Sequence, residues 1–532
     1  MTIQPVEWLD EFQVNNSSNA AHNTPSITQL TNGNVLIVWS TSDDTGAGSS
    51  PGRDIIGQIF DPLGNQVGSE FQLNSLAAAD DEQAPSITAL PNGGFTMTYI
   101  DGDQVSGNTF STRVVVESFN ASGAPTGGVF TVAALTATGL VAYENPTIAV
   151  ASNSNSLIVW EDNVNGDILG QRYNPQSGSL DGPQLTLFSD ASGPGEGTAG
   201  LDVITLANGN FMVAQANQNA STNDEIQVRV VGANGTLLGG AQTVYSALPS
   251  AVDPSMTLLS DGRVAIAWTV DNAGATDAGV RVSILNANGT VAVGGVNGLN
   301  PATTVADDQV EPEVVGLQDG GFVVFWADRG TSDLHGQRYN SSGSKVGGEF
   351  DVENWSSIQL SNIDAVLLED GRVQITWEED FSSGNIYSAI WDPRTAANSS
   401  AADGYIIGTP GSDTINSTDD AEIVVGDDGN DRIIIGSADQ DDADYDGGLG
   451  TDTLVFGSFT ANISFSGLGT GDVTNFEEFE FESQFVNIVR NIFFTADQAS
   501  QFATIDFDGS SLNSENFQVI MGMATTFDLS GV

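Results

Sequence analysis

Aspartates that could bind a cation recur at a regular spacing between residues 408 and 455. Three nine-residue stretches follow the pattern G-G-x-G-x-D-x-U-x, where U is a large apolar residue: GTPGSDTIN from 408, GDDGNDRII from 426 and GGLGTDTLV from 447. Glycine permits turns that other residues adopt only with strain, and the apolar residue can point into a narrow core. The aspartate in the sixth place can then reach an ion between successive coils.

These stretches resemble the calcium-binding nonapeptide repeats of the RTX family of secreted bacterial proteins. The resemblance implies a parallel β-roll over residues 404–456, with calcium as a structural cofactor, and type I secretion directed by an uncleaved C-terminal signal. The implied metal ligands are the side chains of Asp413, Asp431 and Asp452, with Asp428 as a further candidate, and the backbone carbonyls near Gly408, Gly426 and Gly447.

The stretches also depart from the family pattern. Thr409 and Asp427 replace the second glycine, and Pro410 is unusual at its place. Three extra residues interrupt the register between the second and third stretches. We therefore expect a few calcium ions and not a long row.

A second arrangement suited to a hard cation lies inside that interruption. Asp442, Asp444 and Asp446 alternate before Gly447 in a D-x-D-x-D-G order, and oxygen-preferring cations bind such clustered carboxylates. An EF-hand does not fit, because its twelfth place would be Thr453 and not glutamate. A solvated acidic loop is the alternative interpretation.

Residues for catalysis are few. The only histidines are His22, in a polar loop, and His335, beside GQRYN, so a histidine-based triad or a multi-histidine metal centre is not expected. Paired carboxylates for glycoside cleavage stay open, because acids follow an aromatic strand at 161–162 and 378–380. Their recurrence in several copies of a repeat favours a shared turn or cation role.

That repeat, of about 50 residues, supplies the elements that must position these side chains. Each copy opens with two apolar runs around a turn, where an Asn-Gly or Asp-Gly pair in most copies predicts a β-hairpin. The seven copies begin at residues 25, 85, 146, 201, 254, 312 and 363. A third strand such as ILGQRYN and a fourth such as SEFQLN follow, so each copy predicts one four-stranded propeller blade.

The seventh copy lacks a fourth strand, while EFQVN at 11–15 precedes the first copy and nearly matches EFQLN at 70–74. We predict an all-β, seven-bladed β-propeller over residues 1–395, closed by the N-terminal strand, which leaves no open edge between the first and last blades. A stack of sandwiches or a linear array of β modules is the rival architecture. The units also resemble VW...GQRF...G.EF.VN repeats of secreted bacterial surface proteins.

Two residue types recur at fixed places in the repeat. Tryptophans at the end of the second strand could stack on sugars, but their place on an apolar strand favours packing in the blade core. Arginines recur on third strands, at Arg172, Arg281 and Arg338. We expect structural pairing with acids and not a ligand contact for these arginines.

Composition limits the partners. With 69 acidic and 13 basic residues the formal net charge is −56, which argues against nucleic acid and offers oxygen ligands to calcium. The chain has no cysteine, and neither a signal-peptide pattern nor an apolar run for membrane insertion is found. At low cytosolic calcium the clustered carboxylates should keep the C-terminal region largely unfolded, and millimolar calcium outside the cell would fold it.

We predict a linker at 396–403 after the propeller, then the β-roll, then a β-rich cap at 457–532 that holds the secretion signal. The favoured function is a secreted, calcium-binding, non-enzymatic module for binding, adhesion or cell-surface assembly. Its predicted location is extracellular or at the cell surface, and its predicted partners are calcium ions, an extracellular glycan or cell-surface component, and further copies of the chain.

Two alternatives stay open. The first is an extracellular hydrolase or lyase that acts on polysaccharide or another polymer, because propellers host such enzymes and fold alone does not decide function. A deep central pocket lined by unrepeated acidic residues would favour it. The second is a self-assembling subunit of a surface layer or filament, which calcium-dependent assembly would favour.

Overall fold

A computed structural model gives the fold of the chain. It describes residues 5–521 except for the internal ranges 17–19, 43–52, 75–80, 107–108, 139–142, 152–154, 190–197, 218–224, 247–249, 272–278, 296–297, 303–307, 355–358, 381–383, 395–404, 410, 418–422, 436–443, 457–462, 465–472, 482–489, 495–503 and 508–516. Within this described part, no helix has the length and apolar character that crossing a membrane requires.

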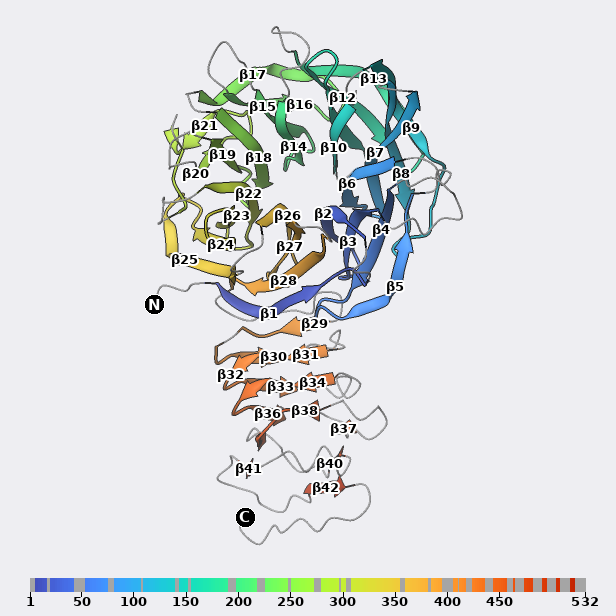
Figure 1. Ribbon diagram of the computed structural model, residues 1–532. Helices are drawn as coiled ribbons and strands as arrows, with labels where there is room; N and C mark the ends of the chain where they lie inside the picture. Colours follow the sequence, from blue (N-terminus) through green and yellow to red (C-terminus); the bar gives the residue numbers. More distant parts are fainter. Residues whose placement is uncertain are drawn as a thin grey trace. The chain divides into compact units, whose positions relative to one another are not determined.

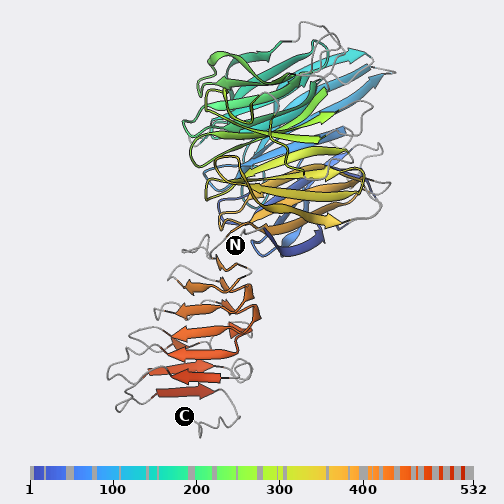
Figure 2. The ribbon, with the colours of Figure 1, turned by 90° about the vertical axis from the view of Figure 1, so that its left-hand side faces the viewer.

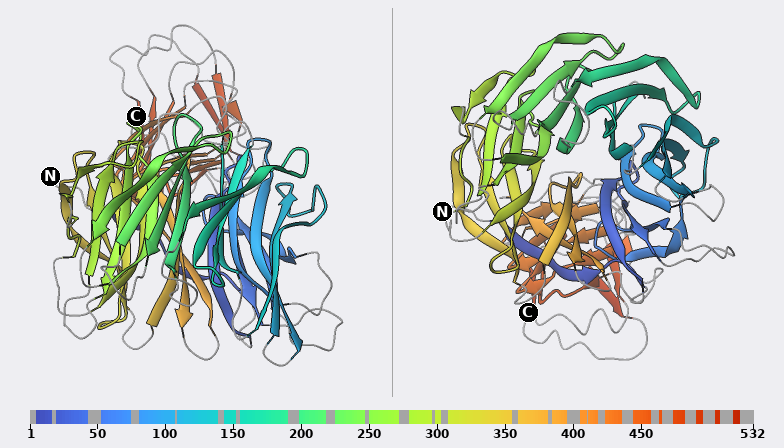
Figure 3. Two further views of the ribbon diagram at one scale, coloured as in Figure 1. Left: turned by 90° about the horizontal axis from the view of Figure 1, so that it is seen from above. Right: turned by 45° about the horizontal axis from the view of Figure 1, so that its top comes forward.

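Seven four-stranded antiparallel sheets form a ring (Figure 1 and Figure 3, right). The strands, blade by blade, are β2 (His22–Gln29), β3 (Val35–Thr41), β4 (Asp54–Phe60) and β5 (Gln66–Gln72); β6 (Asp81–Ala89), β7 (Phe95–Ser106), β8 (Thr109–Phe119) and β9 (Phe130–Thr138); β10 (Tyr143–Val150), β11 (Ser156–Asp162), β12 (Asp167–Asn174) and β13 (Ser179–Phe188); β14 (Thr198–Thr205), β15 (Phe211–Asn217), β16 (Glu225–Val231) and β17 (Leu237–Ser246); β18 (Ser250–Leu258), β19 (Val264–Asp271), β20 (Gly279–Leu285) and β21 (Val291–Val293); β22 (Gln309–Gly316), β23 (Phe322–Asp328), β24 (Asp333–Tyr339) and β25 (Lys345–Asn354); and β26 (Gln359–Leu367), β27 (Val373–Asp380), β28 (Ile386–Asp392) and β1 (Val6–Gln13). The first-named strand of each blade contacts those of both neighbouring blades, and β26 contacts β2, which closes the ring. The predicted all-β, seven-bladed propeller is therefore confirmed, and the rival stack or linear array is wrong.

The outer strand of blade seven comes from the N-terminus, since β1 pairs antiparallel with β28 (Figure 1). Just after β1, Asn15 Oδ1 accepts a hydrogen bond from Ile386 N at 2.8 Å. Blade one contains the same contact, in which Asn74 Oδ1 accepts from Ile55 N at 3.0 Å. EFQVN and EFQLN are alike because they occupy the same position in two blades.

The repeated Gly-Gln pair on the third strand serves the fold. Gln58, Gln171 and Gln337 are buried, and each side-chain amide donates to backbone carbonyls of the third and fourth strands, near a shift in their register. A β-carbon on Gly336 would lie 2.3 Å from the ring of Phe350 on the fourth strand. The glycine thus makes room for the aromatic residue of the EF pair, and the repeated motif is structural.

The aligned tryptophans are confirmed as core residues. They are 0% exposed and pack in five apolar clusters, each of which joins two neighbouring blades. The five are Trp39, Trp160, Trp268, Trp326 and Trp377. None of them is accessible to a sugar in this structure.

In the residues that follow the propeller in the sequence, short strands pair in parallel (Figure 2). One sheet contains β29 (Tyr405–Ile407), β31 (Ile423–Val425), β34 (Asp444–Asp446) and β38 (Val473–Thr474), and the other contains β30 (Thr414–Asn416), β33 (Arg432–Ile435), β36 (Thr453–Phe456), β39 (Glu478–Phe481) and β41 (Thr504–Phe507). The smaller pairings involve β32 (Asp428–Gly429) with β35 (Leu449–Gly450), and β37 (Ile463–Ser464), β40 (Arg490–Phe494) and β42 (Phe517–Met521). The eighth nonapeptide residues Ile415, Ile433 and Leu454 are buried, so the apolar place of the motif points inward.

The chain divides into two compact units. Unit one comprises Met1–Leu368 and Val373–Pro393, and unit two comprises Glu369–Arg372 and Arg394–Val532. The predicted linker at 396–403 lies outside the described residues, and the predicted cap is described mainly in its strands.

Candidate functional site

A break in the inner strand recurs in every blade. In all seven, the pairing of the first and second strands shifts register near the start of the inner strand. The residue at the break has positive φ, from 48° to 53° in six blades and 100° at Gly200. These residues are Thr24, Ala84, Asn145, Gly200, Asp253, Glu311 and Asn362. Such a β-bulge bends the strand and re-aims the side chains that follow.

Two residues after each break lies a side chain that we assign to the channel ring. The ring consists of Ser26, Ser86, Thr147, Asp202, Ser255, Glu313 and Asp364. Most of these side chains connect one blade to the next. Asp202 Oδ2 accepts from Met256 N at 2.7 Å, and Asp364 Oδ2 accepts from Ile27 N at 2.9 Å across the junction of blades seven and one.

Serine makes the same connection without a charge. Ser26 Oγ accepts from Ile87 N at 3.3 Å, and Ser255 Oγ accepts from Val314 N at 3.0 Å. The fold therefore requires an acceptor oxygen at these positions and does not require a carboxylate.

The channel ring lines a cavity of about 520 Å³ to which all seven inner strands contribute. Its acids are confined to blades four to seven, where Asp202, Asp253, Glu313 and Asp364 line it. Blades one to three contribute hydroxyl, amide and small apolar side chains. No positively charged side chain belongs to the described lining.

Burial raises the pKa of all four carboxyls. The pKa of Asp202 and that of Asp253 are each about 7, and that of Asp364 is about 6. The pKa of Glu313 lies well above its ordinary value, first through burial and then through the nearby charges of Asp364 and Asp202. The side chains are only half-buried, so water reaches the cavity while much of their hydration is lost. The cavity therefore holds acids that ionise at higher pH than ordinary carboxyls do.

The acids that follow the second strand have structural partners. Asp162 Oδ1 accepts from Val164 N at 3.0 Å in the β11–β12 turn. Glu378 Oε2 accepts from Thr24 N at 3.1 Å and from Asn362 Nδ2 at 2.7 Å, beside the junction of blades seven and one. Neither acid belongs to the described lining of the cavity. The shared turn role is confirmed for Asp162.

Neither histidine belongs to the described lining of the cavity. The sequence places His22 in a loop, but it begins β2, and its Nδ1 accepts from Trp39 Nε1 at 3.2 Å. His335 Nδ1 lies 2.9 Å from Asp351 Oδ1 on the neighbouring outer strand. Strand pairing therefore accounts for the positions of both histidines.

Two of the recurring third-strand arginines pair with acids, as expected. Arg172 forms an ion pair with Asp181, and Arg338 lies 2.6 Å from Asp319. Arg281 instead donates to the carbonyl of Val280 at 3.0 Å. The pairing acids, Asp181 and Asp319, are not those that follow the second strand.

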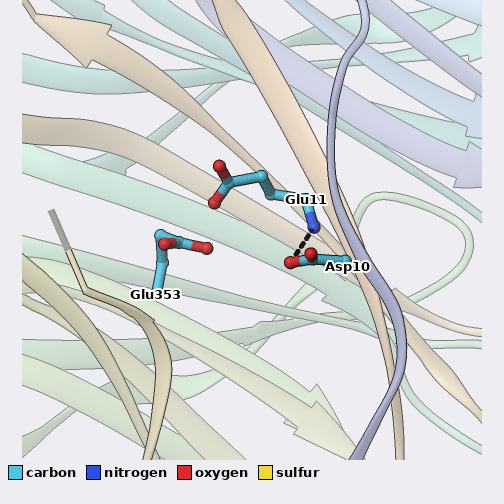
Figure 4. A group of neighbouring side chains, drawn as sticks. All are labelled: Asp10, Glu11 and Glu353. Carbon is cyan, nitrogen blue, oxygen red and sulfur yellow. Dashed lines mark hydrogen bonds between the residues drawn. The ribbon is translucent and has the colours of Figure 1, made fainter.

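A further group of acids joins the outer strands of blades six and seven (Figure 4). Asp10, Glu11 and Glu353 each place a carboxylate oxygen within 4.8 Å of the others. Asp10 is exposed, and its Oδ1 accepts from Glu11 N at 2.9 Å. Acidic groups of this kind are common at protein surfaces without an ion, so we assign no site to it.

In unit two, the nonapeptide aspartates come together in one column. Asp413 N donates to Asp431 Oδ1 at 2.7 Å, and Asp431 N donates to Asp452 Oδ1 at 2.8 Å. The same link continues to Glu477, whose Oε2 accepts from Asp452 N at 2.8 Å. The sequence motif missed Glu477 because this residue stands outside the nonapeptides.

The column presents oxygens that suit a cation. Asp431 Oδ2 and Asp452 Oδ2 are buried and have no hydrogen-bond partner among the described residues. Burial raises the pKa of both carboxyls, to about 7 for Asp431. A β-carbon on Gly408 would lie 1.9 Å from Gly426 O, and one on Gly426 would lie 2.3 Å from Gly447 O, so backbone carbonyls approach the coil closely. An all-oxygen donor set with unsatisfied carboxylates fits the calcium that the RTX resemblance implies.

The structure describes only some of the other predicted metal ligands. Asp442 lies outside the described residues, and so does the side chain of Asp428. Asp444 is exposed on β34. Asp446 Oδ1 accepts from Gly448 N at 3.0 Å and from Asn475 Nδ2 at 2.8 Å, which places it beside the next coil.

Fold and site thus define a seven-bladed β-propeller with an acidic central cavity, followed by a unit of parallel strands. No family model matches the sequence, and no curated protein matches it. Among solved structures, the chain is similar to a protein of unknown function from Dyadobacter fermentans DSM 18053, with 12% identity over 74% of this chain and 99% of that one and a TM-score of 0.45. It is also similar to the NanB sialidase from Streptococcus pneumoniae (12% identity, 72% and 70% of the chains, TM-score 0.41) and to an alpha-L-arabinanase from Penicillium chrysogenum (13%, 66% and 99%, 0.39). Likeness at this level carries no argument about activity.

Proposed function

We propose that the central cavity is the active site of an extracellular hydrolase that acts on a polysaccharide. The observation that carries the proposal is the replacement of a hydroxyl by a carboxylate at Asp202, Glu313 and Asp364 of the channel ring. The other ring positions show that the fold does not need these charges, and burial of a carboxyl in its ionised form is unfavourable. Raised pKa values in a cavity are typical of functional acids.

Glycoside cleavage uses one carboxylic acid that protonates the leaving oxygen and one carboxylate that activates water or attacks the sugar. Glu313 suits the first role, because its raised pKa keeps the proton available near neutral pH. Asp364 suits the second, because its pKa of about 6 leaves it mostly ionised at pH 7. The backbone amides of Ile27 and Ala365 hold the two oxygens of Asp364 in place.

The lining favours hydrolysis over elimination. A lyase that removes a proton beside a uronate carboxylate is helped by a positive group that neutralises the substrate charge. The described lining supplies no positive side chain and four acids of its own. A neutral or amino-bearing polysaccharide therefore suits the cavity better than a uronate or sialic acid polymer.

The test is hydrolysis of a polysaccharide panel, with neutral, amino-bearing and uronate members, by the full chain in calcium. We expect new reducing ends from a neutral or amino-bearing member, and a loss of about 100-fold or more in kcat for Glu313→Gln. Unsaturated sugar products from uronates would instead identify a lyase and overturn the hydrolase assignment.

A matched control variant is Asp61→Asn. Asp61 Oδ1 accepts from Leu63 N at 3.0 Å in the β4–β5 turn, outside the described cavity lining, so activity should not change. Binding of a glycan without cleavage by the wild-type chain would contradict the enzyme proposal and return the non-enzymatic binding module to first place.

We also propose that unit two binds calcium, and that the protein acts outside the cell or at its surface after type I export. The buried, unpartnered oxygens of Asp431 and Asp452 favour this second role. When bound, calcium would neutralise the column and so stabilise the coils. Calorimetry should show calcium binding that Asp431→Asn with Asp452→Asn abolishes, and light scattering of the same samples would detect calcium-driven assembly.

A further inference from the structure

The column of acids continues past the last nonapeptide. We propose that Glu477, Asp452 and the backbone carbonyl of Asn475 form a divalent-cation site that the nonapeptide motif does not include. This site lies between the coil at 447–452 and the coil at 475–477. The inference deepens the proposed calcium binding of unit two and rests on it.

Strand register places Glu477 in the column. Asp431 directly precedes β33, Asp452 directly precedes β36, and Glu477 directly precedes β39. β33 pairs in parallel with β36 from Arg432↔Thr453, and β36 pairs with β39 from Thr453↔Glu478. The three acids therefore occupy equivalent positions on successive coils.

The hydrogen bonds repeat along the same direction. The link from Asp452 N to Glu477 Oε2 has the length of the link from Asp431 N to Asp452 Oδ1, at 2.8 Å each. In both links, one carboxylate oxygen accepts a hydrogen bond from a backbone amide of the preceding coil. The other oxygen of each carboxylate takes no part in this link.

The backbone carbonyl repeats as well. A β-carbon on Gly447 would lie 2.0 Å from Asn475 O, just as one on Gly426 would lie 2.3 Å from Gly447 O. Asn475 adopts φ 56°, a left-handed conformation that asparagine tolerates, and it stands where the nonapeptide at 447–455 has its first glycine. Glu477 follows Asn475 by two positions, whereas Asp452 follows Gly447 by five, so the nonapeptide spacing is absent and the sequence pattern does not reveal the coil.

An independent observation points to a ligand at this place. Asp452 is 0% exposed, and its Oδ2 has no hydrogen-bond partner among the described residues. A buried carboxylate oxygen in that state is unfavourable unless a cation or donor meets it. Carboxylates of two coils and one carbonyl supply the hard oxygen donors that calcium prefers over softer metals.

The experiment counts bound calcium per chain by equilibrium dialysis, with calorimetry for affinity, on the full wild-type chain, Glu477→Gln and Glu478→Gln. Glu477→Gln keeps an acceptor oxygen for Asp452 N but removes the charge. Glu478 is exposed and neighbours Glu477, so its variant is a control for the loss of one charge. We expect Glu477→Gln to bind one calcium ion fewer than the wild type and Glu478→Gln to bind the same number.

Unchanged number and affinity in Glu477→Gln would overturn this site while leaving the proposed calcium binding intact. Absence of calcium binding by the wild type would instead overturn both. If circular dichroism shows that Glu477→Gln does not fold, Glu477→Asp keeps the charge and shortens the reach. We expect at least a 10-fold weaker affinity for one ion in Glu477→Asp, and wild-type affinity for every ion would overturn the site.

Discussion

At the scale of single residues, the channel ring shows that the hydrogen bond between blades does not depend on a negative charge. Asp202 accepts from Met256 N, which a serine hydroxyl could do equally well, yet its pKa of about 7 shows that its ionised form is disfavoured in the fold. We expect Asp202→Ser to raise the free energy of unfolding at pH 8 by on the order of 1 kcal/mol. This value is smaller than the pKa shift alone would give, because the Asp202 side chain is partly hydrated. Chemical denaturation at pH 8 measures this change.

The comparison variant is Asp202→Ala, which removes the acceptor together with the charge. It leaves Met256 N without its partner, so it should be less stable than Asp202→Ser by about 1 kcal/mol. Equal stability of the two variants would show that the inter-blade hydrogen bond contributes nothing.

The sequence reveals residues of the two sites to different degrees. Asp413, Asp431 and Asp452 were predictable, because glycine and aspartate at fixed offsets determine where each carboxylate lies on a coil. Glu477 was not, because only the parallel pairing of β36 and β39 brings it into the column. Asp202 carried a usable signal, since it stands two residues after Gly200, at a position where four other copies have Ser or Thr after a proline.

At the scale of elements, the third and fourth strands of a blade pack closely because a glycine on the third strand has no side chain. A β-carbon at Gly336 would lie 2.3 Å from the Phe350 ring. We expect Gly336→Ala to lower the free energy of unfolding by about 1–3 kcal/mol, because the ring must move in a packed core. Thermal unfolding, with Gly348→Ala as the control, tests this. A β-carbon on Gly348 meets nothing within 4 Å, so a similar loss in both variants would contradict the steric explanation.

The hairpins were predictable, because the turn of each Asn-Gly or Asp-Gly pair needs a residue with positive φ. Its glycine adopts this conformation, as Gly33 does at 81°. The inner-strand bulges were not predictable. Residues such as Thr24, Ala84 and Asn145 adopt φ near 50° there, although nothing local demands it. The repeat alignment marks the position that carries Asp202, but it does not predict the bulge that precedes this side chain in the cavity lining.

At the scale of the whole molecule, the N-terminal strand holds the ring closed. Trp8, Leu9 and Phe12 pack against the apolar cluster between blades seven and one, and β1 covers the edge of β28. We expect deletion of residues 1–15 to lower the unfolding temperature and to cause self-association through the exposed edge. Calorimetry and light scattering test this, with deletion of residues 1–4 as the control. Addition of a peptide of residues 6–15 should reverse both effects, and its failure to do so would indicate a different cause.

Charge acts on the whole propeller through two effects that salt can separate. The unfolded chain ionises its aspartates near pH 4, whereas Asp202 and Asp253 ionise at about 7 and Asp364 at about 6 in the fold. Between these values the native state binds more protons, so its stability falls as pH rises from about 4 to 7, and the penalty is absent below pH 4. Surface repulsion from the net charge of −56 has the same sign, but about 1 M salt shortens its range to about 3 Å.

We therefore expect denaturation in 1 M NaCl to show greater propeller stability at pH 5 than at pH 8. Tryptophan fluorescence is the suitable signal, because all eight tryptophans precede residue 392 and report on the propeller alone. The slope that remains in high salt should shrink in Asp202→Ser, since one group of raised pKa is then absent. A pH dependence that disappears in salt would assign the whole effect to surface charge and would remove the support that the raised pKa values give to a catalytic cavity.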